Sequence, residues 1–143
     1  MQISQLLRHK GRDVATIDGT ESVRTALGVL ADKGIGALVV SSDGRRVDGI
    51  VSERDVARGL HAHGAGLLAQ PVSSVMTAQV HTCSPHMGVH DLARTMTDHR
   101  VRHVPVVEDD VLVGIVSIGD VVKARLDELE EERKHMVDYI QTA

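Results

Sequence analysis

Two short segments of the chain carry residues suited to hold an anionic ligand. Ser52-Glu53-Arg54-Asp55 follows a predicted strand and opens a predicted helix, and Ser117-Ile118-Gly119-Asp120 does the same later in the chain. Backbone N–H groups at a helix N-terminus, with the positive end of the helix dipole, favour a phosphate. The serine hydroxyl can donate a hydrogen bond to that phosphate. The aspartate, one turn into the helix, can accept hydrogen bonds from two ribose hydroxyls.

The two segments belong to a larger duplication. Residues 49–56 read G-I-V-S-E-R-D-V and residues 114–121 read G-I-V-S-I-G-D-V, so both copies contain the pattern G-h-h-S-x-x-D, in which h is apolar. A repeated unit of this size cannot close a core alone. We therefore expect two copies packed about a pseudo-twofold axis, with function where the copies meet.

Periodicity predicts the order β-α-β-β-α in each copy, and hence an α/β fold. In the first copy we expect strands at 14–17, 37–41 and 47–52 and helices at 23–33 and 54–63. In the second we expect strands at 80–83, 103–107 and 111–117 and helices at 88–98 and 119–141. The last helix is longer than one repeat needs. Its broken apolar stripe indicates packing on the N-terminal segment or on a second subunit: Val122, Leu126, Leu129, Met136 and Ile140.

The predicted organisation has five segments. Residues 1–12 form an N-terminal segment with a short helix, 13–64 the first repeat and 65–78 a connector. The second repeat spans 79–126, and 127–143 extend the C-terminal helix.

The doubled unit resembles the cystathionine-β-synthase domain, or CBS domain, and the tandem pair resembles a Bateman module of the stand-alone bacterial type. The resemblance covers residues 13–126 and rests on the two G-h-h-S-x-x-D motifs and on the run H-R-V-R-H-V-P-V-V at 99–107. It implies a regulatory or sensor module that binds an adenine nucleotide in the cleft between the repeats. The ligands it implies are AMP, ADP, ATP or NAD(H), with S-adenosylmethionine possible. It further implies a homodimer that signals to an effector protein.

The motif also has a structural explanation. Ser-x-x-Asp is a helix N-cap with an acidic residue three positions later, and a single copy would favour that interpretation. The duplication and the family pattern together favour nucleotide contact at Ser52 and Asp55, and equally at Ser117 and Asp120.

The resemblance implies two nucleotide sites. The first contains Thr16, Ile17, Ile35, Ala37, Ser52, Arg54, Asp55, Arg102 and His103. The second contains Thr82, Cys83, Val101, His103, Val104, Ser117 and Asp120. Strand alternation allows only one of Arg102 and His103 to point to a given face, and the sequence leaves open which one.

The two sites are unequal. In the first copy, Gly36 and Ala37 stand where the second has Arg102 and His103, and in the second copy Gly119 replaces Arg54. The site near Asp55 therefore gathers the cations and is expected to prefer a phosphate-rich ligand. The site near Asp120 is expected to be weak, empty or adapted to another ligand.

Composition excludes several classes of function. With a net charge of −4, one Tyr and neither Phe nor Trp, the chain lacks the electrostatic attraction and the stacking residues of nucleic-acid binders. No apolar run suits a membrane span or a signal peptide, so we expect a cytoplasmic protein. The histidines offer only pairs at ligand spacing, such as His61 with His63 and His86 with His90, so no metal site is expected.

No combination of residues supports catalysis. Cys83 is the only cysteine and has no histidine at a family-specific spacing, and Ser52 lacks a nucleophile elbow. We therefore expect a protein that is not an enzyme and has no catalytic residue. The alternative to a nucleotide sensor is a protein–protein interaction module with vestigial nucleotide sites.

Overall fold

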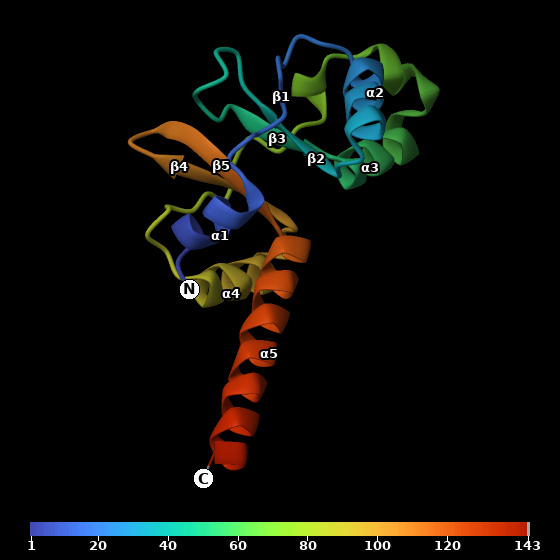
Figure 1. The fold of residues 1–143 in the computed structure, drawn as a ribbon. Helices are drawn as coiled ribbons and strands as arrows, with labels where there is room; N and C mark the ends of the chain where they lie inside the picture. The colour runs from blue at the N-terminus through green and yellow to red at the C-terminus, as the bar shows by residue number, and fades with distance from the viewer. Residues whose placement is uncertain (143) are drawn as a thin grey trace.

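The apolar alternation and the helical spacing produce two α/β lobes, which the computed structural model describes over residues 1–142 (Figure 1). The first lobe contains β1 (Thr16–Ile17), α2 (Val23–Lys33), β2 (Ala37–Val40), β3 (Gly49–Ser52) and α3 (Glu53–His63). Its sheet has the order β1-β2-β3, with β1 parallel to β2 and β2 antiparallel to β3. Two 3₁₀ turns follow, Ala65–Ala69 and Val72–Ser74.

The second lobe contains α4 (Val89–His99), β4 (His103–Glu108), β5 (Val111–Ser117) and the long α5 (Ile118–Thr142). The strands β4 and β5 form an antiparallel ribbon with a register shift between Val106 and Val107. The fold is thus the expected α/β pair with a long C-terminal helix.

The strand predicted at 80–83 is reduced to one bridge. Cys83 pairs in parallel with Val106, through hydrogen bonds from its N–H to Pro105 O (3.0 Å) and from Val107 N–H to its carbonyl (2.8 Å). A turn closed by the Met87 N–H on Ser84 O follows at once (3.2 Å), so the ladder cannot continue.

The N-terminal helix α1 (Ile3–Lys10) packs in the second lobe although it precedes the first repeat. Its buried residues Ile3, Leu6 and Leu7 belong to the core of α4, β4, β5 and the start of α5. The connector behaves reciprocally, because Leu67 and Val72 precede the second repeat but complete the core of the first. Each repeat is therefore completed by the segment that leads into the other.

The helix α5 leaves the body of the molecule after its first two turns. Val121 and Ala124 are its buried residues, and Figure 1 shows the rest extending away from both lobes. The large apolar side chains exposed along it are Ile118, Val122, Leu126, Leu129, Met136, Val137, Tyr139 and Ile140. Within residues 1–142, no helix has an apolar stretch long enough to cross a membrane.

Candidate functional site

Ser52 is the last residue of β3 and the N-cap of α3. Its side chain accepts a hydrogen bond from the Asp55 N–H (3.3 Å), while its own N–H and hydroxyl donate to Asp55 Oδ2 (2.8 and 3.0 Å). This reciprocal pair is a capping box, so the structural role of the motif is present. The other carboxylate oxygen, Oδ1, receives only a long hydrogen bond from the Thr77 hydroxyl (3.3 Å). Asp55 therefore keeps acceptor capacity beyond the cap.

A cavity of about 560 Å³ lies beside this motif, between the two repeats. Its walls come from α3 and the end of β3 on one side, and on the other from residues 79–81 and 99–103 of the second repeat. The volume falls within the range of small-molecule sites in proteins. The site therefore has the size and the shared walls expected of a ligand cleft between repeats.

The cavity is rich in cations. Its lining residues with side chains that can carry charge are Glu53, Arg54, Asp55, Arg58, His81, His99, Arg100, Arg102 and His103. Four arginines thus face two carboxylates, before any histidine is protonated. Arginine forks suit phosphate oxygens, so the electrostatics of the cavity favour an anionic ligand.

Arg102 and His103 both line the cavity. The alternation argument does not apply to this pair, because Arg102 lies in a bend and β4 begins only at His103. The imidazole of His103 is half-buried over Gly36, where a methyl group would lie 3.3 Å from its Cε1 atom. Burial, followed by the charge of Lys10, lowers the pKa of His103.

Several lining residues are not among the predicted site residues. Arg58 follows Arg54 by one helical turn, a spacing that could have indicated it. Arg100 sits in the left-handed region (φ 54°) at the end of α4. The rings of His81 and His99 stack, with centroids 4.1 Å apart, and this contact joins segments that no local pattern connects.

The other residues expected in the first site lie elsewhere. Thr16, Ile17, Ile35 and Ala37 are not part of the cavity lining, and Ile17 and Ala37 are buried in the first lobe. Val101, expected in the second site, lines this cavity instead. The cavity thus brings the Ser52 motif together with residues 99–103 of the other repeat and with Gly36 of its own.

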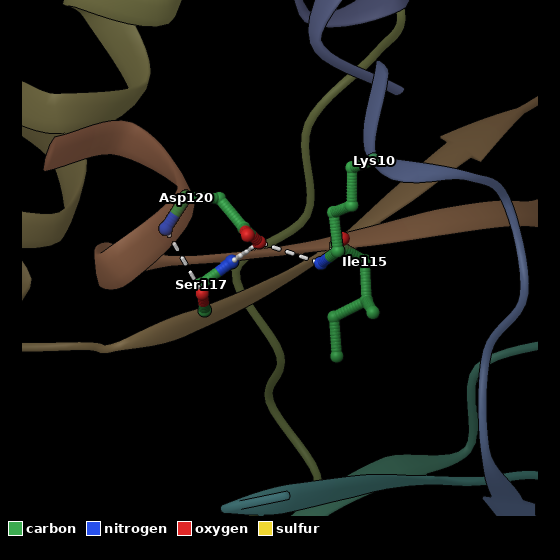
Figure 2. Close-up of polar contacts among 4 residues, drawn as sticks. All are labelled: Lys10, Ile115, Ser117 and Asp120. Carbon is green, nitrogen blue, oxygen red and sulfur yellow. Dashed lines mark hydrogen bonds and ion pairs between the residues drawn. The ribbon is translucent and has the colours of Figure 1, made fainter. Parts of the chain in front are cut away.

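The second motif forms a similar cap but has an additional partner. Ser117 N–H donates to Asp120 Oδ2 (2.8 Å), and Asp120 N–H donates to Ser117 Oγ (3.2 Å). Figure 2 shows the ammonium group of Lys10 between Asp120 Oδ2 (2.5 Å) and the Ile115 carbonyl (2.6 Å). Comparison of the two repeats in the sequence predicts no cation beside Asp120. The structure places one there, Lys10, at the end of α1.

Lys10 and Asp120 form an ion pair in which the carboxylate is favoured in its charged form. Burial by itself raises the pKa of the Asp120 carboxyl, but the hydrogen bond from Lys10, the Ser117 N–H and the charge of Lys10 outweigh it, so the pKa is lowered. Asp120 is therefore ionised, and Lys10 compensates its charge.

The other residues predicted for the second site differ in their burial. Cys83 and Val104 are buried in the second core, and Thr82 is exposed. Burial raises the pKa of the Cys83 thiol to about 12, so the thiol stays protonated at neutral pH and is a poor nucleophile. Over residues 1–142, no group of three His, Cys, Asp or Glu side chains is placed to hold a metal ion.

Known proteins share this architecture. The family model described as "CBS domain" matches residues 5–62 and again 72–127. A crystal structure of a CBS-domain-containing protein from Agrobacterium tumefaciens is 45% identical and superposes with a TM-score of 0.84, covering 87% of this chain and 99% of that one. A mitochondrial CBS domain-containing protein of Arabidopsis thaliana is 35% identical over 97% of this chain and 71% of its own length.

The structure of a third relative contains a ligand. It is a CBS domain protein from Pyrobaculum aerophilum complexed with AMP, 30% identical, with a TM-score of 0.74. The superposition covers 84% of this chain and 89% of that chain.

Proposed function

Because the chain belongs to the CBS-domain family as a tandem pair, we propose that it is a non-catalytic regulatory module that binds an adenine nucleotide between its repeats. One observation carries the proposal: the Ser52–Asp55 motif of one repeat and the basic segment 99–103 of the other line one cavity. The AMP complex of the archaeal relative supports the choice of an adenine nucleotide.

In this proposal, the residues from the two sides of the cavity contact different parts of the nucleotide. Asp55 Oδ1, which receives only the long Thr77 hydrogen bond, accepts from the ribose hydroxyls. The Glu53 and Asp55 N–H groups already donate to the Gly36 carbonyl and to Ser52 Oγ, so the phosphate donors proposed on α3 are the Arg54 N–H and guanidinium. Arg102 reaches the same phosphates from the second repeat, so the ligand touches both lobes.

The charge of the cavity favours more than one phosphate. Four arginines against two carboxylates leave an excess of positive charge that a monophosphate compensates less well than a di- or triphosphate. We propose ADP or ATP as the preferred ligand, before AMP and NAD(H). S-adenosylmethionine, whose sulfonium is a cation, fits this cavity least.

In this proposal, regulation follows because the ligand contacts both repeats. A nucleotide that contacts both repeats stabilises one relative arrangement of the lobes over others, and only such differential affinity can send a signal. The receiver in this proposal is a separate effector protein, reached directly or through a homodimer.

A panel of thermal shifts tests the nucleotide site. AMP, ADP, ATP, NAD, NADH and S-adenosylmethionine are added to the wild type and to Asp55→Ala. A ligand at about 100 times its dissociation constant adds about 2.7 kcal/mol to the free energy of unfolding, which raises Tm by several degrees. We expect the largest shift with ATP or ADP, and none with Asp55→Ala.

The matched control is Asp48→Ala, which removes a carboxylate from the same lobe, outside the cavity lining. Its side chain accepts from the Ser42 N–H, so it also reports the cost of a lost local hydrogen bond. A flat panel with the wild type would contradict the proposal. It would favour the second candidate function, a protein–protein interaction module, for which the exposed apolar side chains of α5 are the supporting observation.

A further inference from the structure

The second Ser-x-x-Asp motif is occupied by the chain itself. Lys10, at the end of α1, places its ammonium group on Asp120 and on the Ile115 carbonyl (Figure 2). We propose that Lys10 is the residue that closes this second site, so that the protein binds one nucleotide per chain, beside Asp55. This inference rests on the proposed function, and it specifies that only one of the two Ser-x-x-Asp motifs is open to a nucleotide.

The first motif shows what the same place looks like without the lysine. There, the Thr77 N–H donates to the Ile50 carbonyl (2.8 Å) and the Thr77 hydroxyl donates to Asp55 (3.3 Å). Ile50 and Ile115 hold the same position in the two repeats. A neutral hydroxyl with a long hydrogen bond thus stands beside Asp55, whereas a cation at 2.5 Å stands beside Asp120.

The two contacts differ in what a ligand would have to replace. A ribose hydroxyl can add to Asp55 without breaking an ion pair. At Asp120, Lys10 bonds Oδ2, the oxygen that also accepts from the Ser117 N–H. A ribose hydroxyl that bonds Oδ1 therefore meets a carboxylate whose charge Lys10 already compensates, and one that bonds Oδ2 must displace a charge-assisted hydrogen bond, the stronger kind. The side chains of Lys10 and Asp120 are 29% and 24% exposed, so water does not fully replace that contact.

The position of Lys10 is fixed by the packing of its helix. Leu7 is buried against Gly114, where a Cβ atom would lie 2.9 Å from the leucine methyl groups. Gly11 ends the helix with its N–H on the Leu7 carbonyl (2.7 Å) and a φ of 101°, which a side chain would strain. Because the backbone is already ordered by this core, the contact to Asp120 costs only the entropy of one side chain.

Isothermal titration with ATP on the full chain measures the number of sites. We expect one ATP per wild-type chain, abolished in Asp55→Ala. In Lys10→Ala we expect a second binding event, weaker than the first because Gly119 stands where the first motif has Arg54. This second event persists in Lys10→Ala/Asp55→Ala and disappears in Lys10→Ala/Asp120→Ala. Lys10→Gln, which keeps a polar side chain but not the charge, is the second variant if Lys10→Ala does not fold. Arg8→Ala removes a charge from the exposed face of the same helix and should behave as wild type.

Each other outcome decides the matter. Two ATP molecules per wild-type chain, or one in Lys10→Ala as in the wild type, would overturn the inference. Weaker binding in Lys10→Ala would show that Lys10 contacts the ligand rather than excluding it. If the wild type binds nothing but Lys10→Ala binds one ATP through Asp120, the closure by Lys10 stands while the proposed site at Asp55 fails. If neither binds, both fail.

Discussion

His103 lies where both motifs can influence it. It lines the cavity, and the charges that act on its imidazole come from Lys10 and Arg102 on one hand and from Asp120 and Glu53 on the other. Burial and the charge of Lys10 dominate and lower its pKa from the ordinary value of 6.5. In the free protein His103 is therefore neutral at pH 7 and becomes charged only at a lower pH.

A bound phosphate should reverse this shift. Negative charge beside His103 favours the imidazolium and raises its pKa in the complex, so binding takes up a proton. Affinity should therefore rise as pH falls through the interval between the lowered pKa of the free protein and the raised pKa of the complex. The rise is at most about tenfold per pH unit for one proton. Free protein should show the opposite trend, because a lowered histidine pKa makes stability fall as pH drops below 6.5.

Titration calorimetry in buffers of different ionisation enthalpy measures the proton uptake. His103→Asn should remove the uptake while it keeps wild-type affinity at high pH. His81→Asn, which changes another histidine of the same cavity, is the matched control. Equal proton uptake in the wild type and in His103→Asn would assign the effect to another group.

The sequence predicted some individual residues of the site and could not predict others. Ser52, Asp55, Arg102 and His103 line the cavity. The first two follow from the repeated motif, and the last two from the family resemblance alone. Lys10 did not follow, because its partner Asp120 is 110 positions away and periodicity says nothing about which lobe α1 joins. The ligand contacts themselves stay predictions.

At the scale of elements, the end of α4 differs from its counterpart in the first repeat. Helix α2 ends at Gly34, with φ 62°, a left-handed conformation that glycine adopts without strain. Helix α4 ends at Arg100, with φ 54°, which a residue with a side chain adopts at a cost of about 1 kcal/mol. Arg100, with this strained backbone, lines the cavity, so we expect its charge to contribute to ligand binding.

Arg100→Gly should therefore raise stability and lower affinity together. We expect a gain of up to about 1 kcal/mol in the free energy of unfolding, which raises Tm by a few degrees. ATP should bind more weakly, because one cation has left the cavity.

Arg100→Ala separates the two effects, since alanine loses the charge but keeps the cost of the left-handed region. Thermal unfolding and an ATP titration on the three proteins provide the measurements. Unchanged affinity in both variants would show that Arg100 has no part in binding.

The elements themselves were largely predictable, and the exceptions have physical causes. The helices α2, α3 and α4 begin and end within about two residues of their predicted limits, because apolar spacing defines them locally and a glycine follows α2 and α3. The strand expected at 80–83 depends on a partner in β4 and on a turn at residues 84–87, so one bridge remains. Such pairing cannot be obtained from alternation alone.

At the scale of the whole molecule, the exchange of leading segments joins the lobes. Leu7 of α1 completes the second core, and Leu67 of the connector completes the first. Neither repeat can therefore move far without disturbing the core of the other. In the proposed function, a nucleotide between them would act on a coupled pair. The duplication seen in the sequence predicted the pair but not this exchange.

The exposed apolar stripe of α5 has the spacing of a helix–helix contact. Val122, Leu126, Leu129, Met136 and Ile140 recur at spacings of four and three residues, interrupted by a polar residue at 133. Alternate spacings of this kind place side chains on one seam that suits a second helix with the same pattern. The occupant that we propose is α5 of a second copy, in a homodimer.

Charged substitutions on this seam should separate the dimer without affecting the cavity. Leu126→Glu with Leu129→Glu removes apolar area worth about 1.5–3 kcal/mol per buried side chain and sets like charges against each other. Sedimentation velocity should show a wild-type dimer and a variant monomer. Glu131→Lys, on the face of the same helix opposite the stripe, should remain dimeric. Because neither leucine lines the cavity, ATP should still bind the monomer.

A monomeric wild type would contradict the proposal that α5 of a second copy covers the stripe. Loss of ATP binding in the monomeric variant would show that the seam and the cavity are coupled through α5.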